Sequence, residues 1–336
     1  MNSTADVYEL TAAVIAEALS LSVISSVGIV GNILVLLSSY FYSGRLTKYA
    51  LSVFIVNLGI ADLSLTMFYE PLIVGAVLID AWPFGLRFCE ISATVILICS
   101  YASINFLAVI AVHNYVLIMK NSQLYAKIFT KKACALISLF GWVFAILCSL
   151  NMVVNQNRLQ YSPEYHQCRI DFTKIPVVEM VPLTLCGFTL PCTIIAFCYC
   201  SIYITVKRSR RRVAAPAFAI STDMAVEQAR QVRRRKENVK LAFSMFLVVA
   251  AFVICFLPFQ TVYLLTLFGI ELPYFVSRSA DFINTLNYSI NPIIYAWRND
   301  QYRVAFKKIL LGRCFSRRNM NNKWAVKPST GITPVS

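Results

Sequence analysis

Long apolar runs separated by short polar segments dominate the chain. The run from Leu86 to Met119 carries no charged residue and no histidine between Ile91 and Val112, and about 20 apolar residues are enough to cross a bilayer. A few polar side chains interrupt this run: Ser92, Thr94, Ser100, Ser103 and Asn105. Because an unpaired polar group in hydrocarbon is costly, we expect these side chains to face protein or trapped water. The pattern therefore predicts a helix at the centre of a bundle.

Similar runs recur along the chain, at 18–42, 49–79, 86–119, 133–155, 176–206, 239–268 and 275–297. The chain is 58% hydrophobic and only 14% charged, whereas a soluble domain is usually about one quarter charged. The pattern predicts an all-α membrane protein with seven transmembrane helices. Apolar and basic residues then alternate at helical spacing from Tyr302 to Leu311, which predicts a short amphipathic eighth helix on the membrane surface. We expect a terminus at 1–17, a bundle at 18–300, the surface helix at 301–312 and a tail at 313–336.

The net charge of +15 at first suggests nucleic acid, but its distribution favours a membrane. Most lysines and arginines fall within 43–48, 120–132, 207–240 and 298–327. Basic loops collect on the cytoplasmic side, so we expect a multi-pass plasma-membrane protein with its N-terminus outside. The basic segments should meet anionic lipids or a cytosolic partner, not nucleic acid. Asn2 begins a glycosylation sequon, and Cys314 is a candidate palmitoylation site.

Two cysteines and one carboxylate stand out from the apolar background. Cys89 and Cys168 both fall on the oxidising outer side, which favours a disulfide between them. Asp62 lies near the middle of the second span, and an intramembrane carboxylate indicates a functional site. The alternative is that Asp62 is a protonated structural hydrogen-bonding group. No nucleophile–base pair or phosphate loop suggests an enzyme.

Other carboxylates fall in the outer half of the predicted bundle. Asp281 and Glu70 could line a vestibule and favour a cationic or hydrogen-bonding ligand. The alternative is that they are solvated or paired with Arg87 or Arg278. The residues alone leave both interpretations open.

Short motifs occur one per predicted helix and in a fixed order. They are Gly31-Asn32, Asp62, Cys89 with Cys168, Trp142, Pro191 with Tyr199, Phe252 with Pro258, and Asn291-Pro292 with Tyr295. Over about residues 20–312, the chain thereby resembles the rhodopsin-like (class A) G-protein-coupled receptors. Within that family it is most similar to melatonin receptors and then to opsins, through Tyr69-Glu70-Pro71-Leu72 and the loop 159–168.

The resemblance implies roles for individual residues. Asp62, Ser103, Asn287 and Asn291 would line a sodium-binding cavity. The ligand would contact Asp281, Glu70, Ile96, Phe172, Phe256 and Thr285. The activation switch would comprise Ile104, Pro191, Phe252, Pro258, Pro292, Tyr199 and Tyr295, together with Asn114 and Tyr115. A heterotrimeric G protein, and arrestin, would be the cytosolic partners.

Departures from the family pattern limit these roles. The motif at the inner end of the third span reads His113-Asn114-Tyr115, so asparagine replaces the family's arginine. This predicts weak coupling to G protein, or, as an alternative function, a receptor-like protein that acts through other partners. Opsins bind retinal through a lysine, and this chain has Thr285 at that position, so no covalent cofactor is expected. Ile170 and Phe172 replace residues that the resemblance would assign to melatonin contacts.

Overall fold

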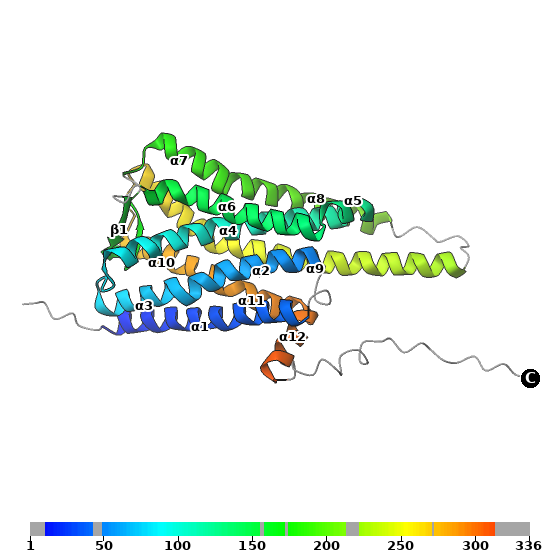
Figure 1. Ribbon diagram of the computed structural model, residues 1–336, viewed down its shortest axis with the longest axis horizontal. Coiled ribbons are helices and arrows are strands. Elements are labelled where there is room, and N and C mark those ends of the chain that lie inside the picture. The colour runs from blue at the N-terminus through cyan, green and yellow to red at the C-terminus, as the bar shows by residue number, and fades with distance from the viewer. Residues whose placement is uncertain are drawn as a thin grey trace, which may run out of the picture.

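The computed structural model describes residues 11–42, 49–154, 158–171, 174–212, 222–270 and 272–312, and it shows a bundle of long helices lying side by side (Figure 1). The helices are α1 (Ala12–Phe41), α2 (Tyr49–Ser64), α3 (Glu70–Ile79), α4 (Gly85–Met119), α5 (Ser122–Ile128), α6 (Lys131–Val154), α7 (Val177–Thr184), α8 (Leu190–Arg212), α9 (Thr222–Leu267), α10 (Tyr274–Thr285), α11 (Asn287–Arg298) and α12 (Asp300–Leu310). The predicted sites Asn2, Phe172 and Cys314 lie outside the described residues.

Six crossings of the described chain are long and apolar enough to span a membrane. The first begins at Ala12, whereas the sequence predicted a start near residue 18. The second joins α2 to α3 through a π-helical turn, Leu65–Tyr69, and a similar turn, Leu185–Thr189, joins α7 to α8. In each case a proline follows the turn closely, Pro71 or Pro191, and proline removes a backbone donor.

The seventh crossing is broken, whereas the sequence predicted one continuous span at 275–297. The chain turns at Leu286, between α10 and α11. Pro292, inside α11, has no N–H for the carbonyl four residues earlier, that of Tyr288. The Asn32 side chain of α1 donates to this carbonyl at 2.9 Å. A polar side chain of one helix thus replaces the backbone bond that proline removes from another.

The α4 helix occupies the centre of the bundle, as its polar interruptions predicted. It packs against α2, α6, α8 and α9. Ser92 and Ser103 are buried, and Ser92 Oγ donates to the carbonyl of Cys89. The close packing of α1 against α11 requires a glycine, because a Cβ on Gly31 of α1 would lie 2.7 Å from Pro292 of α11.

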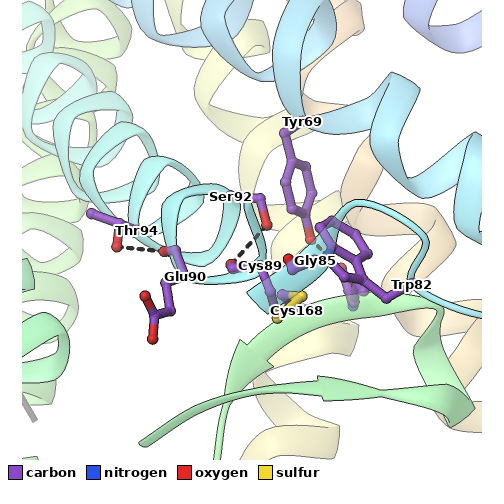
Figure 2. The surroundings of a disulfide bond; sticks show 9 residues. Tyr69, Trp82, Gly85, Cys89, Glu90, Ser92, Thr94 and Cys168 are labelled. Atoms are coloured by element: carbon purple, nitrogen blue, oxygen red, sulfur yellow. Dashed lines mark hydrogen bonds between the residues drawn. A yellow bond between two sulfur atoms is a disulfide. The ribbon is translucent and has the colours of Figure 1, made fainter. Parts of the chain in front are cut away.

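A β-hairpin covers the outer end of the bundle. Strands β1 (Leu159–Ser162) and β2 (Gln167–Ile170) pair antiparallel. The predicted disulfide between Cys89 and Cys168 is present and joins β2 to α4 near the start of that helix, with the two Cα atoms 5.2 Å apart (Figure 2). The hairpin is therefore held against the central helix.

At the opposite end, α12 lies against the bundle, and α9 continues beyond it (Figure 1). Tyr302 and Phe306 of α12 are buried, and Tyr302 stacks on Tyr295 with the ring centroids 5.3 Å apart. Burial raises the pKa of Tyr302 to about 12. Because Tyr302 and Phe306 pack inward on one side, α12 is amphipathic, as the sequence predicted.

Candidate functional site

A cavity of about 200 Å³ runs inside the bundle from the hairpin to Asp62. Side chains from α2, α4, β2, α9, α10 and α11 line it. Asp62 and Asn291 lie at the inner end, and Gln167 and Arg169 lie at the outer end. One cavity therefore connects the outer surface element to the buried carboxylate.

The four residues predicted to hold sodium surround the inner end of this cavity. Asp62 is 2% exposed, and its carboxylate accepts hydrogen bonds from Ser103 Oγ at 3.3 Å and Asn291 Nδ2 at 2.8 Å. Asn287 donates to Asn284, while its own Oδ1 is buried without a partner. A carboxylate, a hydroxyl and an unpaired amide oxygen are ligands that suit a hard cation. The residues present therefore fit a sodium ion.

Aromatic rings form the middle of the cavity wall. Phe252 and Phe256 of α9 stack with centroids 5.3 Å apart, and Phe188 lies 5.1 Å from Phe256. Ile96 and Ile104 of α4 line the same region. Movement of α9 would therefore change the shape of the cavity directly.

At the outer end, a hydrogen-bonded chain connects three elements. Tyr69 donates to Gln167, and Gln167 Nε2 donates to Asp281 at 3.0 Å. Arg278 lies 3.6 Å from Asp281 and also pairs with Glu17 of α1. Asp281 is therefore engaged by its neighbours, although it still lines the cavity.

Two predicted ligand contacts lie elsewhere. Glu70 and Thr285 line a separate cavity of about 10 Å³, which is near the lower limit for one water molecule. Both carboxylate oxygens of Glu70 are buried without a hydrogen-bond partner. Arg87, one candidate partner, instead pairs with Glu90 at 3.2 Å. Of the two outer carboxylates considered from the sequence, Asp281 alone lines the main cavity.

The inner end of α4 contains a buried polar cluster. Asn114 is fully buried, and its amide donates to the Tyr199 hydroxyl of α8 at 3.3 Å. His113 Nδ1 lies 3.3 Å from Asn114 Oδ1, and its Nε2 lies 3.0 Å from the Tyr125 hydroxyl of α5. Asparagine at this position therefore joins α4 to α8, and histidine joins α4 to α5.

The other residues that the resemblance assigns to the activation switch lie on α4, α8, α9 and α11. Pro258 lies inside α9 and Pro292 inside α11, while Pro191 follows the second π-helical turn. Tyr115 packs beside Phe197 at 5.8 Å. The hydroxyl of Tyr295 is buried without a partner.

Two features of this region were not predicted from the sequence. The pairing of His113 with Tyr125 depends on how α5 folds back against α4, which no local pattern specifies. Arg169 lines the cavity, and the only sequence signal for it is its position next to Cys168.

Comparisons with known proteins agree with the motif-based resemblance. The model of the family described as "7 transmembrane receptor (rhodopsin family)" matches residues 31–295. Melatonin receptor type 1B of Rattus norvegicus is 29% identical over 303 residues, covering 87% of this chain and 78% of the receptor. Somatostatin receptor type 4 of the same species is 30% identical over 292 residues, covering 86% and 71%. The fold is similar to squid rhodopsin, with a TM-score of 0.77 at 19% identity over 90% of this chain and 87% of that chain.

Proposed function

Since the chain belongs to the rhodopsin family of seven-transmembrane receptors, we propose that it binds a small ligand in the outer half of its central cavity and signals to a G protein. The observation that carries this proposal is the single cavity that connects the hairpin, the α9 aromatic wall and Asp62. Its N-terminus faces outward and its basic loops face the cytosol, in keeping with the positive-inside rule.

Signalling would follow from a shift between two helix arrangements. A ligand shifts such an equilibrium only by as much as its affinities for the two states differ. A ligand against Phe256 and Phe252 would sense the position of α9, because both rings belong to that helix. As the inner part of α9 moves outward, Tyr199 and Tyr295 would turn inward, and the unpaired hydroxyl of Tyr295 is free to gain a partner.

Sodium would favour the inactive arrangement. The ion would be held by Asp62, Ser103 and the free oxygen of Asn287, with Asn291 beside them. It would supply positive charge next to a buried carboxylate and would stabilise whichever state has the better-formed site.

The proposal includes weak coupling to the G protein, because Asn114 stands where the family has an arginine. Asn114 is short, uncharged and bonded to Tyr199, so it cannot reach an inserted helix as a long cation would. The exposed basic residues of α9, such as Arg230 and Lys236, would still attract a partner or anionic lipid. The second candidate, a receptor-like protein acting mainly through other partners, including arrestin, is favoured by this same asparagine.

The cavity can be tested by blocking it. Purified receptor would be screened for thermal stabilisation by amines, indoles, nucleosides, lipids and peptides. Ala93→Phe would fill space in the cavity wall, and Ala135→Phe would place the same group on an exposed face of α6 as a control. A ligand that stabilises the wild type and Ala135→Phe, but not Ala93→Phe, would support the proposal. Stabilisation that survives Ala93→Phe would place the ligand elsewhere.

A further inference from the structure

The outer end of the cavity contains a guanidinium without a carboxylate partner among the described residues. Arg169 lies on β2, and its guanidinium sits 4.0 Å from the centroid of the Tyr165 ring. Its Nη1 is buried and has no hydrogen-bond acceptor. The other described arginines of the outer face all pair with carboxylates: Arg87 with Glu90, Arg158 with Glu179 and Arg278 with Glu17.

A buried guanidinium nitrogen without an acceptor among the described residues is unfavourable by itself. Arginine stays protonated in proteins and has five N–H donors. A buried donor without an acceptor loses its hydration and gains nothing in return. The Tyr165 ring offsets part of this loss through a cation–π contact. Asp281, which lines the same cavity, attracts Arg169 electrostatically but forms its described contacts with Gln167 and Arg278. Among the described residues, Nη1 of Arg169 therefore lacks an acceptor, and the cavity is where one can enter.

The backbone fixes the arginine in this position. Arg169 pairs with Gln160 in the hairpin register, and its neighbour Cys168 is bonded to α4. On the other side of the cysteine, Gln167 is held between Tyr69 and Asp281. Figure 2 shows how Tyr69 and the disulfide converge on this end of α4. Such an anchored donor is preorganised for a ligand.

The rest of the cavity suits an apolar group. Between Arg169 and the Asp62 cluster, the wall includes Phe188, Phe256 and Phe259. At about 200 Å³ the space is small. A molecule that satisfies both ends would have a compact apolar body and one acceptor group at its outer end.

We propose that the ligand is a small amphipathic acid whose carboxylate pairs with Arg169 and whose apolar body lies against the aromatic wall of α9. A carboxylate matches the planar fork of a guanidinium with two parallel hydrogen bonds. This inference rests on the proposed function, because it names the ligand class of the same cavity.

The test compares molecules that differ only in their polar group. Two skeletons distinguish the sources of the acid: 3-phenylpropanoate for aryl acids and octanoate for fatty acids. Each is measured beside its primary amide and its matching amine, by thermal shift and by direct binding to the purified receptor. We expect at least one acid to bind ten-fold or more tightly than its amide.

Two arginine variants identify the contact. Arg169→Gln should lower acid affinity at least ten-fold and change amide affinity by less than three-fold. Arg169→Lys keeps the charge but loses the fork, so it should retain a reduced preference for the acid. If Arg169→Gln does not fold, the acid-against-amide comparison in the wild type and Arg169→Lys still decides the question.

Failure of this inference is separable from failure of the proposed function. Acids that bind no better than amides, or a preference that Arg169→Gln leaves unchanged, would overturn the assignment of Arg169. If amines or neutral compounds then bind and Ala93→Phe abolishes their binding, the cavity is a ligand site for another class. If none of the compound classes screened binds in a way that Ala93→Phe abolishes, the proposed function falls as well.

Discussion

At the scale of single residues, Asp62 is the buried carboxylate at the inner end of the cavity. Both of its oxygens accept hydrogen bonds, from Ser103 and from Asn291, and the oxygen of Asn287 remains unpaired nearby. We expect the melting temperature to be higher in sodium chloride than in potassium chloride of equal ionic strength, because sodium fits the oxygen ligands and binds the folded state.

The control for this prediction is a carboxylate outside the bundle. Asp62→Asn should abolish the difference between the two salts. Asp80→Asn should preserve it, since Asp80 is exposed and has a positive φ of 53°, which asparagine tolerates. Equal melting temperatures for the wild type in the two salts would remove sodium from the mechanism.

The second prediction for a single residue concerns Asn114. Asn114→Arg should increase G-protein activation at matched surface expression by roughly ten-fold, because hydrogen bonds with a charged group contribute about 1.5–3 kcal/mol. Asn114→Gln is the matched control: it lengthens the side chain without adding charge, and it should give no such gain. Strong activation by the wild type, unchanged or lowered by arginine, would show that the chain couples through a different set of contacts.

The sequence predicted some of these residues and not others, for a physical reason. Asp62 was visible because a carboxylate within an apolar run is conspicuous on any helix. The contacts of Arg169 and His113 were not predicted, because each involves a ring that a turn of the chain brings close, Tyr165 or Tyr125. Glu70 and Thr285 were expected in the main cavity, but their direction depends on local helix geometry that hydropathy does not reveal.

At the scale of helices, the bond between α1 and α11 compensates for a proline. Asn32→Ala would leave the Tyr288 carbonyl without its donor. We expect this to lower the free energy of unfolding by about 1–3 kcal/mol, the usual cost of an unpaired buried group. Thermal or denaturant unfolding of the purified protein would measure the change.

A second substitution tests the cause. Pro292→Ala restores a backbone N–H that can serve the same carbonyl. Asn32→Ala should therefore cost less in a Pro292→Ala background than in the wild type, and a double-mutant cycle would report the difference as a coupling energy. Additive effects would mean that the two residues act separately.

An ion pair joins the inner part of α9 to the start of α12. Lys240 Nζ lies 2.8 Å from Asp300, and hydrogen bonding to Lys240, with Arg303 nearby, lowers the pKa of Asp300. Both side chains are exposed, so the pair is weak and is screened by salt. It nevertheless opposes outward movement of α9.

We therefore expect Lys240→Gln to raise basal G-protein activation by at most a few-fold, and less at high ionic strength. Because the pKa of Asp300 is lowered, the contact is present at neutral pH and is lost only as the pH falls through that lowered pKa. Lys236→Gln, an exposed lysine one turn earlier on α9, is the control. Equal effects of the two substitutions would indicate general loss of charge and not loss of this pair.

At the scale of the whole molecule, the sequence predicted the architecture more securely than the details of its helices. Seven apolar runs, a basic inner side and the motif order suffice for the bundle, since the bilayer fixes the length of each crossing. The division of the seventh crossing at Leu286 and the two π-helical turns were not predicted. Such irregularities depend on side chains of other helices that bond to unpaired backbone groups, as Asn32 bonds to the Tyr288 carbonyl. Those side chains lie far away in the sequence.

The π-helical turn at Leu65–Tyr69 has a consequence for how this receptor could acquire a new ligand. Tyr69 lines both the main cavity and the small one, whereas Glu70 lines the small one and not the main one, and successive helical residues differ in direction by about 100°. A π-helical turn holds one residue more than the α-helical turn it replaces, so deleting one codon within it would leave the helix on either side in its present direction. Glu70 would keep its place at the small cavity, and the residue lost would come from the wall of the crossing beside the main cavity. Insertions and deletions in this turn, and not only point mutations, are therefore a route by which a receptor of this kind could change what it detects without disturbing the rest of the helix.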